Sequence, residues 1–89
     1  MLFLLTNRTR PNLSPAQYAE LATLAKAFYD SMPADVTIRG EWAAIDRSCN
    51  YSLLEAPGIE TVRRIQAPFE PFTDTQIVAV TAIRGWAEP

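Results

Sequence analysis

The chain has 89 residues with a formal net charge of −2, and 48% of these residues are hydrophobic. A chain of this length is expected to form one domain, which we place over residues 1–89. Basic and acidic residues are interspersed without a basic stripe, so the sequence predicts no nucleic-acid binding. No apolar stretch of the sequence is long enough to span a bilayer, so no membrane partner is expected either.

The chain contains no histidine and a single cysteine, Cys49. The lack of imidazole excludes Ser-His-Asp and Cys-His catalysis and histidine ligands for haem or metal. One cysteine forms neither an intrachain disulfide nor a zinc site, and a buried inert thiol fits a reducing compartment. We therefore expect a cytoplasmic protein with no metal site and no cofactor, whose chemistry uses carboxylates, tyrosines, arginines, Lys26 or backbone groups.

The first part of the chain predicts a strand followed by a helix. Residues 1–8 form a continuous apolar run that turns polar at its end, which is typical of a central strand covered on both faces. Ser14 can cap a helix and Gln17 completes a capping box. Apolar residues then recur with helical spacing, so an amphipathic helix is predicted over residues 15–31, ending before Pro33.

The rest of the chain predicts a hairpin, a short helix and a last strand. Residues 36–46 are strand-like, and Gly40 within them indicates a bulge or a close approach of another group to the backbone. Residues 49–56 form the second strand of the hairpin. A short helix is expected between Pro57 and Pro68, because proline ends a helix. The β-branched, apolar residues 76–83 predict the last strand.

The order strand-helix-strand-strand-helix-strand predicts a ferredoxin-like α+β fold. Right-handed crossovers place both helices on one face of a four-stranded antiparallel sheet. The other face must then be polar or meet a partner. Residues 2–5 and 77–80 supply apolar side chains to both faces. We therefore expect two copies to pack sheet against sheet as a homodimer that closes an α/β barrel.

Four segments carry a family resemblance: Met1-Leu2-Phe3, Gly40-Glu41-Trp42, residues 52–57 and residues 77–80. In these segments the chain resembles the dimeric α/β-barrel superfamily, and within it the small muconolactone-isomerase-like proteins. The superfamily includes cofactor-free monooxygenases, polyketide cyclases and haem-binding peroxidases, and the missing histidine argues against the last of these. The resemblance implies a small-molecule cleft between the sheet and the helices, and assembly into dimers or higher homo-oligomers.

Strand register decides which polar residues share a face of the sheet. If Arg47-Ser48 is a two-residue turn, Trp42 pairs near Leu53, and Trp42, Tyr51 and Glu55 lie on one face. Glu55 is the preferred catalytic residue, because burial beside apolar neighbours would favour its protonated form and suit it to proton transfer. Tyr51 is its expected catalytic partner. The alternative is that Glu55 caps the second helix or pairs with an arginine.

Five further residues are candidates for substrate binding. Trp42 offers an aromatic wall, although plain core packing is the alternative. Tyr18 and Tyr29 lie on the inner stripe of the first helix, where they either reach a pocket or belong to the core. Arg39, which is expected to face away from Trp42, could hold a ligand carboxylate or form an exposed ion pair. Asn7 ends the first strand and completes the set.

Two classes of function follow from these candidates. The first is a cofactor-independent enzyme of the isomerase, cyclase or monooxygenase type, which acts on a small unsaturated or aromatic metabolite by carboxylate and tyrosine proton transfer. The second is a non-catalytic dimer that binds a small ligand or serves assembly. In an assembly role, Trp86 or residues 68–72 could form the contact.

Overall fold

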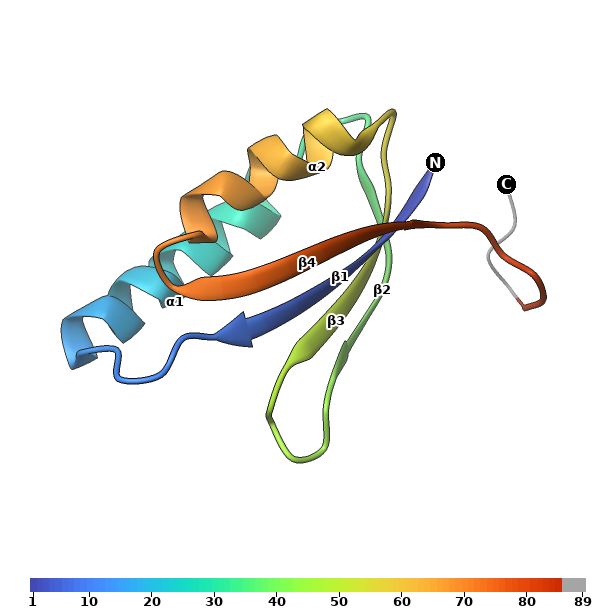
Figure 1. Cartoon of the computed structure of the whole chain (residues 1–89). Helices are drawn as coiled ribbons and strands as arrows, with labels where there is room; N and C mark the ends of the chain where they lie inside the picture. Colours follow the sequence, from blue (N-terminus) through green and yellow to red (C-terminus); the bar gives the residue numbers. More distant parts are fainter. Residues whose placement is uncertain (86–89) are drawn as a thin grey trace.

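The computed structural model describes residues 1–85, so Trp86 lies outside the described residues. The four strands form one antiparallel sheet in the order β2-β3-β1-β4, and both helices lie on one of its faces (Figure 1). This arrangement confirms the predicted ferredoxin-like fold. Within residues 1–85, no helix has the length and hydropathy needed to cross a membrane. The elements are β1 (Leu2–Thr9), α1 (Pro15–Asp30), β2 (Thr37–Ala43), β3 (Asn50–Glu55), α2 (Ile59–Gln66), a short 3-10 turn η1 (Ala67–Phe69) and β4 (Thr73–Val80).

The first helix begins at the capping box that the sequence predicts. The Ser14 hydroxyl accepts a hydrogen bond from the Gln17 backbone N–H at 3.1 Å, and the Gln17 side chain accepts one from the Ser14 N–H at 2.8 Å. The helix ends at Asp30 with Ser31 as its C-cap, before Pro33. Within the described chain, no side chain of α1 is buried. Its start is therefore fixed by local hydrogen bonds more than by a deeply packed face.

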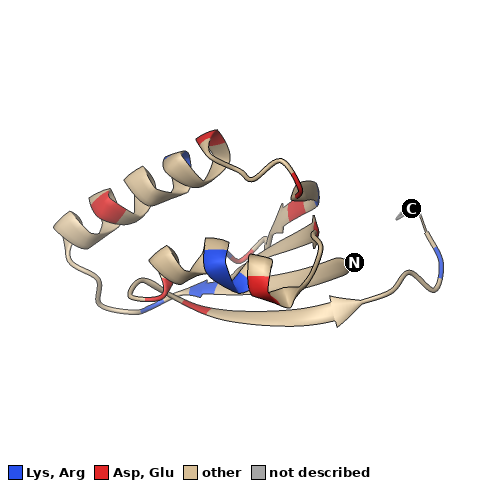
Figure 2. Ribbon diagram, turned by 90° about the horizontal axis from the view of Figure 1, so that it is seen from above, with Lys and Arg blue, Asp and Glu red and all other residues tan. Residues whose placement is uncertain are grey.

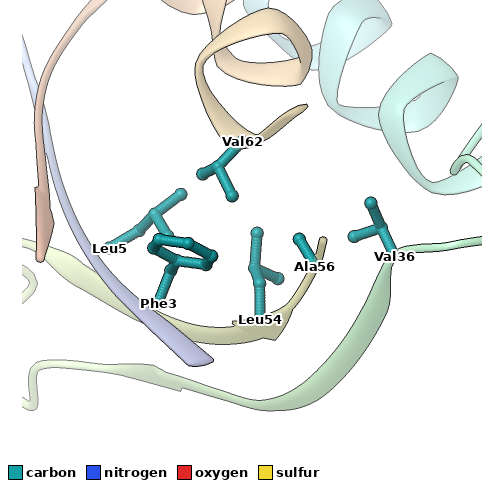
Figure 3. Close-up of a cluster of buried hydrophobic side chains, with 6 residues drawn as sticks. All are labelled: Phe3, Leu5, Val36, Leu54, Ala56 and Val62. Carbon is teal, nitrogen blue, oxygen red and sulfur yellow. The ribbon is translucent and has the colours of Figure 1, made fainter. Parts of the chain in front are cut away.

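Alternating residues of β1 divide the sheet into two faces. Phe3 and Leu5 are fully buried beneath the helices, whereas Leu2 and Leu4 lie on the outer face and are partly exposed. Val62 of α2 closes the core from above. Figure 3 shows the side chains of Phe3, Leu5 and Val62 converging between the sheet and α2. The core consists of Phe3, Leu5, Val36, Leu54, Ala56 and Val62.

The helix-facing side of the sheet is apolar at one end and polar at the other. Phe3 pairs with Leu54 at the apolar end, which α2 covers. Four residues farther along β1, Asn7 pairs with Asn50 on one side and Thr75 on the other. The polar end cannot form a dry core, because buried amides and hydroxyls need hydrogen-bond partners. A polar site is therefore located where the core ends.

The predicted two-residue turn at Arg47-Ser48 is wrong. Residues 44–49 connect β2 to β3, and Trp42 pairs with Tyr51 rather than with Leu53. The loop is held by the Asp46 carboxylate, which accepts a hydrogen bond from the Ser48 N–H at 3.0 Å. Hydrogen bonding by the side chain and then the backbone of Ser48 lowers the pKa of Asp46. Arg47 takes the left-handed conformation with φ of 64°. The longer loop shifts the register by an even number of residues, so the predicted shared face is preserved.

The predicted irregularity at Gly40 is confirmed as a β-bulge between Ile38 and Gly40. A Cβ atom at Gly40 would lie 2.6 Å from Cη2 of Trp42, so the indole rests over this glycine. The bulge also changes the expected direction of Arg39. Its guanidinium reaches Glu55 on the outer face, which Trp42 shares, instead of pointing away from Trp42.

The last strand begins and ends three residues earlier than predicted, at Thr73 and Val80. Residues 73–75 lack the apolar character used to predict a strand, yet they pair in register with residues 7–9 of β1. Hydrogen bonding between strands is a property of the backbone, so a polar segment opposite a central strand completes the ladder. This pairing brings Thr73 and Thr75 beside Asn7.

Candidate functional site

A cleft of about 210 Å³ lies between α1 and the polar end of the sheet. Most of its α1 side is hydrocarbon, contributed by Leu21, Ala25 and Phe28. Phe28 is held in place by an edge-to-face contact with Phe69 of η1, with the ring centroids 5.6 Å apart. An apolar wall facing a few polar groups is the common composition of a small-molecule site. The polar lining residues from the sheet include Asn7, Glu41, Asn50, Ser52 and Thr73.

Tyr29 and Glu41 form the main polar contact in this cleft. The Tyr29 hydroxyl, on α1, donates to Oε2 of Glu41, on β2, at 2.7 Å. The Ser52 hydroxyl donates to the same oxygen at 3.4 Å. The hydrogen bond to Glu41, partial burial and the negative charge of Glu41 together raise the pKa of Tyr29 to about 12. Tyr29 is therefore protonated at neutral pH and positions the Glu41 carboxylate.

A second hydrogen-bonded group orients Asn7. The Thr75 hydroxyl donates to Oδ1 of Asn7 at 2.7 Å, and the Thr73 hydroxyl lies 3.2 Å from that of Thr75. Thr73 also donates to the backbone carbonyl of Phe69 at 3.2 Å. Because the amide oxygen of Asn7 is engaged by Thr75, its N–H groups are left to donate toward the cleft. The site thus pairs a carboxylate with an amide donor.

The structure brings two of the predicted site residues into the cleft. Asn7 and Tyr29 line it, from β1 and α1 respectively. Tyr18 lies on the same helix but is 51% exposed, and the cleft lining in the described chain does not include it. Tyr29 is 53% exposed, about as much as Tyr18, so the two tyrosines differ in their position along α1 and not in depth. Tyr29 is near the end of α1 that approaches β2.

The other four predicted site residues lie on the outer face of the sheet. Trp42 and Tyr51 are a cross-strand pair there, and both are exposed. Arg39 Nε donates to Oε1 of Glu55 at 2.7 Å, which matches the alternative in which Glu55 pairs with an arginine. The Glu55 side chain is 38% exposed, so it lacks the burial expected for it. The catalytic roles of Glu55 and Tyr51 stay predictions.

The sequence reasoning did not identify Glu41, Asn50 or Ser52 as site residues. The sequence could have indicated them through the alternation of residues between the two faces of a strand. Asn50 and Ser52 alternate with Leu54, so they share its face, and Glu41 pairs with Ser52. Once Leu54 is known to be buried beneath the helices, all three must face the same side. In the sequence, however, Leu53 and Leu54 are adjacent, so hydrophobicity does not tell which of the two is buried beneath the helices.

Figure 2 shows the positions of charged residues along the two helices and the sheet, with Lys and Arg interspersed among Asp and Glu. Three ion pairs account for several of them outside the cleft. Arg10 contacts Asp74 at 2.8 Å, Lys26 contacts Asp30 at 2.9 Å, and Arg63 contacts Glu60 at 3.0 Å. Pairs of this kind at exposed positions contribute little to stability.

Residues 1–88 match the family model described as a domain of unknown function, DUF3303. The chain belongs to the DUF3303 family. No curated protein sequence matches it. This membership covers the sheet, both helices and the cleft of the DUF3303 chain, since all of them lie within residues 1–85.

The DUF3303 chain is also similar to solved structures. Its match to a muconolactone isomerase spans 100% of this chain and 97% of that chain at 20% sequence identity, with a TM-score of 0.70. Its match to SCO4226 from Streptomyces coelicolor A3(2) spans 92% of this chain and 100% of that chain at 22% sequence identity, with a TM-score of 0.52. Rv0793 from Mycobacterium tuberculosis has a TM-score of 0.47 at 11% identity, with 94% and 98% covered. At these identities the likeness shows the shared fold alone.

Proposed function

We propose that this DUF3303 protein is a cofactor-independent enzyme that moves a proton within a small unsaturated metabolite. Within the isomerase, cyclase and monooxygenase types considered, we favour an isomerase, because proton removal and return need no further reactant. The observation that carries the proposal is the Glu41 carboxylate in the cleft, held by Tyr29 at 2.7 Å. The fold shared with muconolactone isomerase supports the same class by analogy.

In the proposed reaction, Glu41 acts as the general base. Its carboxylate removes a proton from a carbon next to a carbonyl group, and the electron pair moves into an enolate. The amide N–H groups of Asn7 stabilise the enolate oxygen. The proton then returns from Glu41 to the far end of the conjugated system, which shifts the double bond. Tyr29 and Ser52 hold the carboxylate in one orientation by hydrogen bonds.

The test compares Glu41→Gln with Glu55→Gln. Unsaturated five-membered lactones and cyclic enones are incubated in D₂O, and deuterium incorporation and double-bond migration are followed by proton NMR. We expect Glu41→Gln to lose roughly 100-fold or more of the rate, since a positioned general base contributes on the order of 10² to 10⁴. Glu55→Gln is expected to retain most of it.

Two results would change this assignment. If Glu55→Gln abolishes exchange while Glu41→Gln retains it, the chemistry occurs on the outer face, as the catalytic prediction for Glu55 and Tyr51 states. If wild-type protein exchanges no proton of any probe that it binds, the non-catalytic ligand-binding alternative replaces the enzyme. The apolar wall of Leu21 and Phe28 would serve either function.

The proposal also includes a homodimer formed through the outer face. Leu53, Leu4 and Val78 are successive cross-strand neighbours there, and Trp42 rests over Gly40 in the same row. Val78 is 53% exposed and Trp42 is 49% exposed, which leaves an apolar band across the sheet. A second copy packed on this band is the expected partner, and higher homo-oligomers and the cytoplasmic location belong to the same proposal.

A further inference from the structure

We infer that the cleft selects an uncharged carbonyl compound, such as a neutral unsaturated lactone or ketone, and discriminates against carboxylates. The inference rests on the proposed function only in using the same cleft. It concerns which substrate binds, whereas the proposed function concerns what happens to it.

The charge of the cleft is negative. Among its lining residues within 1–85, Glu41 carries the formal charge, and the others contribute amides, hydroxyls or hydrocarbon. In a cleft of about 210 Å³, any ligand lies close to this carboxylate. A second carboxylate at such a separation is repelled by Glu41, and the solvent exposure of Glu41 moderates this repulsion without removing it. The repulsion corresponds to roughly tenfold or more in affinity.

The arginines on and beside the sheet lie away from the cleft. Arg8 follows Asn7 on β1, so strand alternation places it on the outer face. Arg39 is bound to Glu55 on the outer face, on the other side of the sheet from the cleft. Arg10 lies beside Asp74, with its Nε donating to the Glu70 carbonyl at 3.2 Å. These pairs hold the guanidinium groups away from Glu41. A ligand carboxylate in the cleft would therefore meet a like charge without the bidentate arginine that usually compensates it.

The donors of the cleft suit a neutral carbonyl oxygen. The Asn7 amide presents N–H groups because its oxygen accepts from Thr75 at 2.7 Å. Asn50 pairs with Asn7 across β3 and β1 and also lines the cleft. Neutral amides donate well to a carbonyl oxygen and stabilise an enolate as it forms. The facing hydrocarbon of Leu21 and Phe28 suits an unsaturated carbon skeleton.

The test uses three lactones that share one unsaturated five-membered ring. The first carries a carboxymethyl group, the second carries the methyl ester of that group, and the third carries a methyl group. The ester matches the acid in size and lacks its charge. Dissociation constants at neutral pH are measured by NMR titration of the protein. We expect the ester and the methyl lactone to bind at least tenfold more tightly than the acid.

Substitution of the charge provides the decisive comparison. Glu41→Gln is expected to bring the affinity for the acid to within about threefold of that for the ester. Glu20→Gln, which removes an exposed carboxylate of α1 outside the cleft, should leave the original selectivity intact. If Glu41→Gln does not fold, rising salt should narrow the gap between acid and ester in the wild-type protein instead.

The inference is overturned if the acid binds wild-type protein as tightly as the ester, if no lactone binds at millimolar concentration, or if neither Glu41→Gln nor added salt changes the selectivity. Failure of the proposed function has a different outcome. In that case the uncharged lactones bind selectively and remain chemically unchanged, which leaves the substrate inference supported and removes only the proton-transfer step.

Discussion

Tyr29 connects α1 to β2 across the cleft through its hydrogen bond to Glu41. The raised pKa of about 12 means that the fold favours the protonated phenol over its ordinary value of 10.0. The associated stabilisation is complete below pH 10 and is lost as the pH rises through about 12. We predict that titration of phenolate absorbance shows a step near pH 12 in wild-type protein. Tyr29→Phe should remove that step.

The matched control for this titration is Tyr18→Phe, which removes a phenol from the same helix without touching the cleft. The step near pH 12 should persist in it. Survival of the step in Tyr29→Phe would show that the hydrogen bond to Glu41 does not hold in solution. Loss of the bond would also remove the structural reason for assigning Tyr29 a positioning role.

At the scale of single residues, the sequence could group side chains but could not choose between the two faces. The strand spacing correctly indicated that Trp42, Tyr51 and Glu55 share one face. The choice of face depends on which alternate residues are buried, and residues 2–5 are apolar at every position. When a strand is apolar on both faces, its sequence does not indicate which face the helices cover. Glu41 was consequently missed in favour of Glu55.

At the scale of elements, α1 depends on its N-terminal cap. In residues 1–85, α1 has no buried side chain, so little tertiary burial compensates for a lost cap. We predict that Ser14→Ala lowers the free energy of unfolding by about 1 kcal/mol, because the Gln17 N–H loses its acceptor. Urea denaturation followed by circular dichroism measures the change. Affinity for cleft ligands should fall as well, since α1 forms one wall.

Ser31→Ala is the control at the other end of α1. Its backbone N–H donates to the Ala27 carbonyl at 2.9 Å, and alanine preserves that bond. We expect a change within about 0.5 kcal/mol for this exposed position. Equal destabilisation by both substitutions would indicate that α1 is sensitive to any change at its termini, and that the capping box has no special weight.

The elements themselves were largely predictable, because helix caps and apolar periodicity are local properties of the sequence. The β2–β3 connection was not. Its length depends on Arg47 adopting a left-handed conformation and on the Asp46 carboxylate binding the Ser48 N–H. Neither residue type requires that conformation, so a shorter turn was equally consistent with the sequence. The strand at residues 73–75 was not predictable either, because it forms by pairing with residues 7–9 of β1, which are distant in sequence.

At the scale of the whole molecule, the two faces of the sheet have separate expected uses. The inner face changes from core to cleft along its length, while the outer face holds an apolar band bordered by the Arg39–Glu55 ion pair. A charged group on that band would be tolerated in a monomer, where Val78 is 53% exposed. In a face-to-face dimer the same group would be buried without a partner, which costs several kcal/mol.

Val78→Glu is therefore predicted to convert a dimer into a folded monomer. Light scattering coupled to size exclusion should give twice the 9.9 kDa chain mass for wild-type protein and the single-chain mass for Val78→Glu. Ile45→Glu makes the same chemical change at the fully exposed tip of the β2–β3 loop and should remain dimeric. A monomeric wild-type protein at micromolar concentration would contradict the dimer. A dimer unaffected by Val78→Glu would place the interface elsewhere, and the band of Leu4, Leu53 and Val78 would then need another partner.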